Sequence, residues 1–450
     1  MPGTHRDAPR RISLALIFAA LAWPLVAFGG TAAPAALPYG IACLLLLVLV
    51  RPVIDGALDR SINLVACVVI AQCVPLPAAI GSLLSPHRKP LRDALTLAGP
   101  ADETWSTLTI HRPSTLWALL VLLAAIAVFW MARAQFSRGG VRRTVRMVSV
   151  LGAAVSLLAV AQAATAGRNI YWRFPTEFEG PLPFGPFVNR NHFATWIIMA
   201  LPLSVGYAAA RSRRAAPRPR HVSARSRLAG RIDPRTAWLL TAAVAMTVAL
   251  LLSLSRSAML ALALSGAVTL FFVRPRLDRT HGRTLLATTA VVVVLGLAWA
   301  DLPALRGRVA GVPTALADRA TIWRETVPIV RDFWITGTGA GTYQRAMYVY
   351  QRADRTVFFN QAHNHYLQAA AEGGLALIAA LGYALLCLAR TIGRRIAGDT
   401  SEMVWVRIGA ACGLGAVALQ SVGETGLAMP ANAALAAVLT AVAVYERGVD

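Results

Sequence analysis

A polar stretch between residues 319 and 374 holds the side chains best suited to chemistry in this chain. It carries Arg319, a glycine-rich turn at 337–341, and His363, which is followed by an asparagine and a second histidine. A guanidinium offers planar pairs of N–H donors that fit phosphate or carboxylate oxygens. An imidazole exchanges a proton near neutral pH. These residue types favour a site that binds an anionic group and moves a proton close to it.

Further polar motifs interrupt the apolar sequence elsewhere. An Asn-Arg-Asn-His run at 189–192 precedes one apolar segment, a hairpin at 253–257 surrounds Arg256, and Glu424 separates the last two segments. In the topology that the basic residues predict, all of these motifs fall on the same side of a membrane as His363. This convergence predicts one outward-facing polar site.

Membrane-spanning helices are the elements that must position these side chains. The chain is 56% hydrophobic with a mean hydropathy of +0.56, which excludes an ordinary soluble globule. Apolar runs of about 17–25 residues cross a bilayer as helices, and their length excludes a transmembrane barrel. We expect an all-α integral membrane protein of about twelve transmembrane helices. The predicted spans are roughly 12–29, 35–50, 62–84, 115–132, 147–166, 192–210, 237–253, 257–273, 284–300, 366–389, 405–421 and 430–446.

The basic residues predict the orientation of these spans. Most of the 44 lie in alternate short loops, which the positive-inside rule assigns to the cytoplasm together with both termini. The formal charge of +23 is therefore not gathered on one soluble face, and we expect no nucleic-acid partner. The chain is predicted to be one polytopic membrane domain over residues 1–450, with a basic cytoplasmic loop at 211–236.

The largest outward loop is predicted at about 302–363, between spans nine and ten. Its apolar residues recur at helical spacing from Ile322 to Trp334, so we expect a periplasmic loop of short helices that carries part of the site. Its aromatic residues suit an interfacial anchor equally well. The glycine-rich turn lacks the Gly-Lys-Ser/Thr of a phosphate loop. The five cysteines lie in apolar spans without metal-ligand spacing, so we expect neither a metal site nor a disulfide.

Several of these residues also have a purely structural interpretation. Asn191 and Asn364, taken alone, favour helix capping. Arg256 is equally suited to an interfacial position from which its head reaches water. The turn at 337–341 needs no role beyond flexibility.

Glu372 is harder to explain without a partner. It lies about 12 Å along a helix that starts near Asn364, where an acid without a partner costs roughly 2.5–3.5 kcal/mol. His365, Gln368 and Glu372 share one face of that helix. We therefore expect this face to turn into the bundle, with Glu372 meeting an arginine or backbone donors.

Taken together, the motifs resemble the O-antigen ligase and polymerase superfamily of bacterial membrane proteins. The pattern is Arg-x3-Trp from Arg319, Gly-x-Gly-x-Gly-Thr-Tyr from Gly337, and His-Asn-x-Tyr-Leu-x4-Glu-x-Gly from His363 to Gly374. The Ser-Arg hairpin at 255–256, the run at 189–192 and the last hairpin, which contains Glu424, are similar too. The combined motif is specific to the superfamily but much less specific to the acceptor.

The resemblance implies an inverting, metal-independent glycosyltransferase that needs no cofactor. Its donor would be a glycan on undecaprenyl diphosphate, and its acceptor a hydroxyl of a growing glycan or of lipid A-core. It implies a multi-pass protein among the lipids of the bacterial cytoplasmic (inner) membrane, with its active site facing the periplasm. The catalytic positions carried over are His363, as the base, and Arg256 and Arg319. The expected substrate-binding positions are Arg190, Asn191, Asn364, His365, Tyr366 and Glu372.

Three alternatives stay open. A polysaccharide polymerase that joins repeat units on the lipid carrier shares the motif and the chemistry. His365 is a second candidate for the base. A transporter of small anions or lipid-linked sugars belongs to another class, and it would place ionisable residues near the middle of the membrane on interrupted helices. This chain concentrates them at one face, which favours an enzyme.

Overall fold

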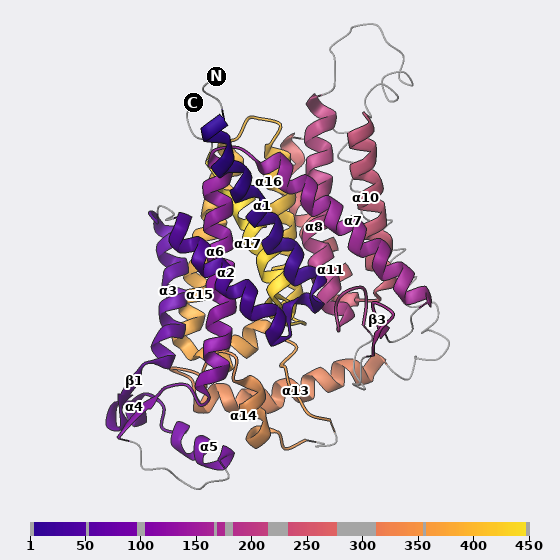
Figure 1. Ribbon diagram of the computed structural model, residues 1–450. Helices are drawn as coiled ribbons and strands as arrows, with labels where there is room; N and C mark the ends of the chain where they lie inside the picture. Colours follow the sequence, from indigo (N-terminus) through magenta and orange to yellow (C-terminus); the bar gives the residue numbers. More distant parts are fainter. Residues whose placement is uncertain are drawn as a thin grey trace, which may run out of the picture.

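Long helices make up most of the chain in its computed structural model (Figure 1). The structure describes residues 4–50, 54–96, 104–165, 169–175, 183–214, 233–276, 312–353 and 357–446. Within these ranges, six helices are long and apolar enough to cross a membrane. They are α6 (Arg112–Ser137), α7 (Val141–Thr165), α8 (Arg190–Arg214), α10 (Pro234–Leu252), α11 (Arg256–Val273) and α15 (His365–Gly398). The chain is thus an all-α membrane protein.

Five further helices of the described ranges pack with these six. They are α1 (Thr4–Val26), α2 (Ala33–Val50), α3 (Ala57–Cys73), α16 (Val404–Gln420) and α17 (Pro430–Val444). Every predicted span overlaps one of these helices except 284–300, which lies outside the described residues, as does most of the predicted loop at 211–236. Buried Asp59 joins α3 to α6, because its carboxylate accepts hydrogen bonds from Trp130 and Arg133.

The prediction of one helix over 62–84 is wrong. Helix α3 ends at Cys73, and strand β1 (Pro75–Pro77) pairs antiparallel with β2 (Trp105–Thr107) before α4 (Ala78–Leu84) begins. Pro75 and Pro77 have no N–H to continue the helical hydrogen bonds, so the chain turns there. A second short pair, β3 (Asn169–Ile170) and β4 (Phe174–Pro175), lies between α7 and α8.

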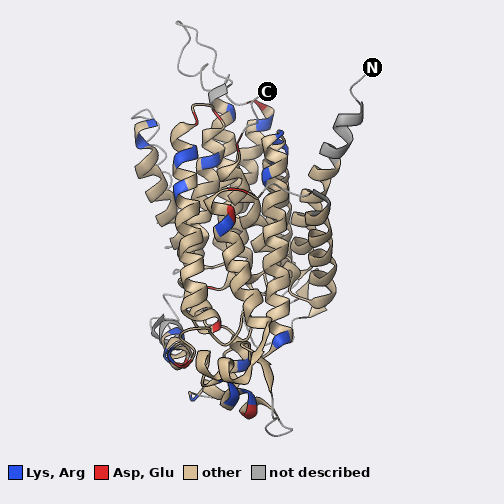
Figure 2. Ribbon diagram, turned by 90° about the vertical axis from the view of Figure 1, so that its left-hand side faces the viewer, with Lys and Arg blue, Asp and Glu red and all other residues tan. Residues whose placement is uncertain are grey.

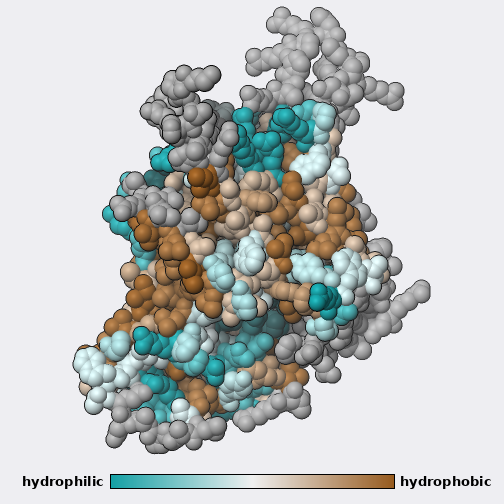
Figure 3. Space-filling model, viewed as in Figure 1, coloured by the Kyte–Doolittle hydropathy of each residue, from teal (hydrophilic) through white to brown (hydrophobic). Residues whose placement is uncertain are grey.

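The two ends of the bundle carry different elements. One end holds the start of α1, the end of α17 and the ends of α8 and α10 that face each other (Figure 1). The opposite end, here named the site end, holds α5 (Arg88–Leu95), α13 (Val312–Asp332) and α14 (Tyr343–Tyr350) (Figure 1). Charged residues lie mostly toward the two ends (Figure 2). Hydrophobic residues gather across the middle of the face in Figure 3. This distribution suits a bundle that crosses a membrane.

Helix α13 differs from the short helices predicted for its loop. It is 21 residues long and lies across the site end of the bundle (Figure 1). Ile329 of α13 and Phe333, which directly follows the helix, join a small hydrophobic core with Tyr343 and Met347 of α14. This core fixes α13 against the elements that carry the glycine-rich turn.

Helices α8 and α16 touch through their backbones. A Cβ atom on Gly206 would lie 2.3 Å from the carbonyl oxygen of Trp405, and one on Gly409 would lie 2.3 Å from that of Pro202. Such small residues let two membrane helices approach closely. Because α16 ends at Gln420, this contact brings the following hairpin toward the start of α8.

Helix α15 is broken near its beginning. Gly374 has φ 58° and ψ −160°, which is not helical. The chain between α13 and α14 pairs with the break: Leu375 N donates to the Trp334 carbonyl at 2.7 Å, and Gly339 N donates to the Glu372 carbonyl at 2.8 Å. The backbone groups freed by the break are therefore bonded to protein, as buried groups at membrane depth must be.

Candidate active site at the site end

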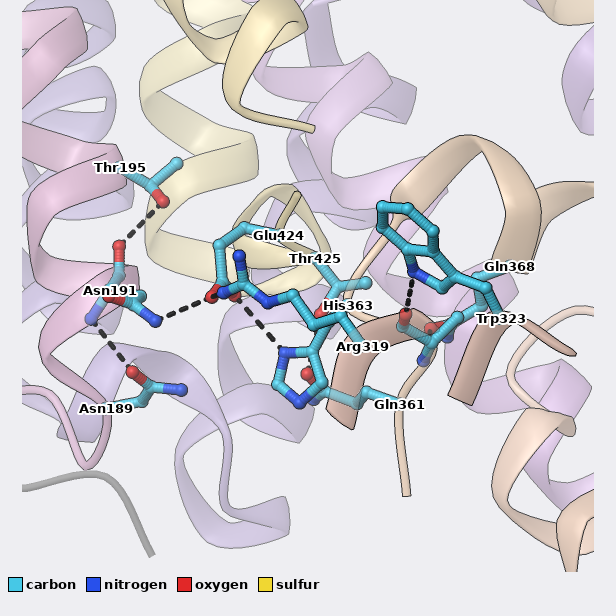
Figure 4. A network of polar contacts seen from close by, with 11 residues as sticks. Asn189, Asn191, Thr195, Arg319, Trp323, Gln361, His363, Gln368, Glu424 and Thr425 are labelled. Atoms are coloured by element: carbon cyan, nitrogen blue, oxygen red, sulfur yellow. Dashed lines mark hydrogen bonds and ion pairs between the residues drawn. The ribbon is translucent and has the colours of Figure 1, made fainter. Parts of the chain in front are cut away.

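A buried carboxylate, Glu424, lies at the centre of a polar cluster (Figure 4). Its side chain is 1% exposed and sits in the hairpin between α16 and α17. Its Oε1 accepts a hydrogen bond from Asn191 Nδ2 at 2.6 Å and from an Arg319 terminal nitrogen at 3.0 Å. Asn191 comes from α8 and Arg319 from α13, so the cluster joins parts of the sequence that lie far apart.

His363 faces the other oxygen of this carboxylate. Its Nδ1 lies 3.7 Å from Glu424 Oε2, and both atoms are buried without another hydrogen-bond partner in the described structure. His363 adopts φ +47°, a left-handed conformation that costs a non-glycine residue of order 1–3 kcal/mol. Backbone strain of this kind persists where the surroundings fix it, often at a functional site.

The chain on both sides of His363 is held by hydrogen bonds. Trp323 Nε1 on α13 donates to the Ala362 carbonyl at 3.0 Å, and His365 N donates to the Ser421 carbonyl at 2.8 Å. Thr425 Oγ1 donates to the Gln361 side chain at 2.5 Å. His363 is thus fixed between α13 and the last hairpin.

The electrostatic balance favours an ionised Glu424. Burial alone raises the pKa of this carboxyl, but the interactions with His363, His192 and Arg319 outweigh burial and hold the pKa below its ordinary value. The ionised Glu424 carboxylate therefore lies beside one arginine and two histidines.

Several buried polar atoms near the ends of α8, α11 and α16 have no protein hydrogen-bond partner in the described ranges. They include His192 Nε2, Ser255 Oγ, both polar atoms of the Gln420 side chain, and Asn432 Oδ1. Buried polar groups are almost always paired, so such a concentration needs an explanation.

Glu372 holds the glycine-rich turn. Its carboxylate accepts hydrogen bonds from Gly341 N at 2.8 Å, Tyr343 N at 3.0 Å and Gln368 Nε2 at 3.3 Å. The sequence predicted either an arginine or backbone donors here, and the structure shows backbone donors. A Cβ on Gly337 would lie 2.1 Å from the Glu372 backbone carbon, so the turn needs glycine at this position.

An apolar cavity of about 610 Å³ lies among α3, α6, α15 and α17. Its lining extends from Leu58 to Val69 on α3 and from His365 to Leu388 on α15. The polar end of the cavity is formed by His365, Gln368 and Glu372. The lining also includes Leu427, three residues after Glu424 in the last hairpin. The cavity therefore reaches from deep in the bundle to the neighbourhood of the Glu424 cluster.

The structure brings three of the predicted site residues together, namely Asn191, Arg319 and His363. Asn191 does not cap α8, because Asn189 Oδ1 accepts from Asn191 N at 2.8 Å. Asn364 does cap α15, where its side chain accepts from Leu367 N at 3.0 Å.

The remaining predicted residues belong to α8, α11 and α15. His365 and Glu372 face the cavity, and the exposed Tyr366 donates to the Ala418 carbonyl at 2.8 Å. Arg190 and Arg256 are the first residues of α8 and α11, and Arg256 is exposed. Their contact with phosphate remains a prediction.

Two residues of the site were given no binding or catalytic role from the sequence. Glu424 was expected only as one of the polar motifs on the outward side, although a lone acid between two apolar spans is a usable signal. Gln72 at the end of α3 gave no signal, yet its side chain bonds the backbone of the glycine-rich turn.

Comparison with known families gives one match. Residues 241–382 match the family model described as O-antigen ligase. The chain is related to the O-antigen ligase and polymerase superfamily. The match and the six apolar helices support a multi-pass bacterial membrane protein, and the matched family is a group of glycosyltransferase-like membrane enzymes of polysaccharide biosynthesis. The matched region contains Arg256, Arg319 and His363, whereas Asn191 and Glu424 lie outside it. No curated protein matches the chain.

Proposed function

We propose that this chain transfers a glycan from undecaprenyl diphosphate to an acceptor hydroxyl, in the manner of an O-antigen ligase. The observation that carries the proposal is the convergence of Arg319, His363 and Asn191 on one buried carboxylate beside a deep apolar cavity. We also propose twelve spans in the inner membrane, with the site end facing the periplasm.

In the proposed step, the acceptor oxygen bonds to the anomeric carbon of the donor sugar as the bond from that carbon to the diphosphate oxygen breaks. The diphosphate leaves with the bonding electrons, and the proton of the acceptor hydroxyl passes to His363. Attack opposite the leaving group inverts the anomeric centre. His363 is half-buried, so a substrate can reach the ring from the side away from Glu424.

Negative charge grows on the leaving diphosphate, so arginine donors stabilise the transition state. Arg319 contacts Glu424 through one terminal nitrogen, and a guanidinium has five N–H donors. It is therefore able to bind a phosphate oxygen while keeping its carboxylate partner. Arg256 is the proposed second donor, and together the arginines replace the divalent cation of Asp-x-Asp transferases.

The cavity supports a lipid-linked donor. Its lining is apolar along α3, α6, α15 and α17, apart from the polar end and Thr440. An isoprenoid chain in this cavity would leave its diphosphate near His365 and the last hairpin. The lipid chain and the charged cluster would then bind two parts of one molecule.

Transfer by the purified full chain in liposomes tests the proposal. The vesicles contain undecaprenyl-diphosphate-linked glycan with either lipid A-core or no added acceptor, and mass spectrometry detects the product. Glycan on lipid A-core supports a ligase, whereas longer chains on the lipid carrier support a polymerase. Bound donor without either product contradicts the proposal.

One observation favours the transporter alternative. The break of α15 at Gly374 lies beside the ionisable Glu372, which is a feature of transporter helices. The hydrogen bonds from Gly341 and Tyr343 to Glu372 instead favour a fixed, structural carboxylate. Flux of labelled lipid-linked sugar or small anion across the same vesicles, without glycan transfer, would decide for a transporter.

A further inference from the structure

We infer that Glu424 is a positioning residue for His363. In this inference, Glu424 Oε2 accepts the Nδ1–H of the imidazole, which leaves Nε2 to take the proton of the acceptor hydroxyl. The inference rests on the proposed function, because the proton moves only when the acceptor attacks the donor sugar. It adds to that function a carboxylate that lies outside the matched family region.

Glu424 Oε2 and His363 Nδ1 lie opposite each other. Glu424 Oε1 is occupied by Asn191 and Arg319, so Oε2 alone faces the imidazole. Neither Oε2 nor His363 Nδ1 has another partner in the described structure. Their separation of 3.7 Å is about 1 Å longer than a charge-assisted hydrogen bond, so a small ring movement closes it.

The surroundings hold the backbone on both sides of the imidazole. The neighbouring peptide groups are fixed by the bonds from Trp323 to Ala362 and from His365 to Ser421. A proton on Nδ1 defines which tautomer is present, and therefore which nitrogen can act as the base. A buried carboxylate also stabilises the imidazolium that forms when Nε2 gains the proton.

Other charged or titratable groups face Glu424 and share its field. They are Arg319 from α13 and His192 from α8, and His192 is buried. Arg319 is needed for the diphosphate in the proposed function, so its contact with Glu424 links donor binding to the base. A purely structural role, in which Glu424 only ties α8, α13 and the last hairpin together, is the competing explanation.

A double-mutant cycle separates the two roles. The variants are Glu424→Gln, His363→Ala and their combination, measured in liposomes for kcat and for donor Kd. We expect Glu424→Gln to lower kcat about 10- to 100-fold, the range for a lost hydrogen bond to a charged group. Donor Kd should be unchanged or lower, because Arg319 loses a competing anion. In the His363→Ala background the same change should lower kcat by less than about threefold.

Asp59→Asn is the matched control. Asp59 is also a buried carboxylate that pairs with an arginine, but it joins α3 to α6 near Leu58, whereas the polar end of the cavity is formed by His365, Gln368 and Glu372. It should lower the melting temperature, while its effect on kcat should be small and the same with or without His363. This control shows what loss of a buried structural carboxylate does alone.

In the kinetic cycle, two results would overturn the inference. One is an undiminished effect of Glu424→Gln in the His363→Ala background, and the other is a loss of donor affinity as large as the loss of kcat. The same cycle on melting temperature does not depend on turnover. If the melting-temperature shifts of the two single variants add up in the double variant, Glu424 and His363 do not interact as a pair. If the shifts are coupled but the wild-type protein transfers no glycan, the proposed function is refuted and the pair is retained.

Discussion

Gln72 connects the glycine-rich turn to α3, and replacing it with leucine tests how the site end is held. Its Nε2 donates to the carbonyls of Thr336 at 2.8 Å and Glu372 at 2.9 Å, and its Oε1 accepts from Ala340 N at 2.9 Å. Leucine keeps a similar size but removes all three bonds. Ala340 N and the Thr336 carbonyl then lose the partner shown here, whereas the Glu372 carbonyl keeps Gly339 N.

Each buried group left unpaired costs about 1–3 kcal/mol. Allowing for the apolar surface that leucine buries, we expect Gln72→Leu to weaken the turn by about 3 kcal/mol. Every 1.4 kcal/mol is about tenfold, so amides at 336–342 should exchange with deuterium on the order of 10²-fold faster. Hydrogen-exchange mass spectrometry of the purified chain measures this directly, and glycan transfer should fall as well.

Gln135→Leu is the control for this change. Gln135 is buried on α6, and its Nε2 has no hydrogen-bond partner in the described structure. Leucine there should leave exchange at 336–342 and the melting temperature unchanged or slightly improved. Wild-type protection of the turn in Gln72→Leu would refute the account of how it is held.

Three other predictions concern orientation, the base and pH. A cysteine at the exposed position 344 of α14 should react with an impermeant reagent from the periplasm, whereas one at position 395 should not; the reverse would place the site on the wrong side. His363→Ala should lower transfer about 10²–10⁴-fold with donor binding retained, and His365→Ala should lower it less; the opposite order would exchange their roles. The pKa of the Glu424 carboxyl is lower in the folded protein than in the unfolded chain. The ionised carboxylate therefore contributes its full stabilisation above the unfolded pKa of about 4.3, and this stabilisation is lost as the pH falls through the folded-state pKa. The melting-temperature difference between wild type and Glu424→Gln should therefore shrink below about pH 4, and a constant difference would contradict this assignment.

The sequence predicted the helices well because their apolar runs have the length that a bilayer requires. The prediction of one helix over 62–84 was wrong because it followed the high hydropathy of this run and overlooked Pro75 and Pro77. The sequence underestimated α13, since an amphipathic helix that lies across the bundle end has no apolar run of spanning length.

The site was predictable only in part, for a physical reason. The sequence marked Arg319 and His363 through their local motif, and Asn364 as a cap. It did not predict that Glu424 unites them with Asn191, because that contact depends on how closely α8 and α16 pack. Long-range polar contacts of this kind depend on the tertiary fold rather than on spacing along the chain.

We propose above all that Arg319 binds the leaving diphosphate of a lipid-linked glycan. The most direct measurement compares transfer from undecaprenyl-diphosphate-linked glycan by wild type, Arg319→Ala and Arg324→Ala in liposomes. Arg324 lies on the same helix, is exposed, and bonds only to Ala320 and Thr321 among its contacts described here. We expect transfer by wild type and Arg324→Ala, and none by an equally abundant Arg319→Ala. Full transfer by Arg319→Ala would contradict it.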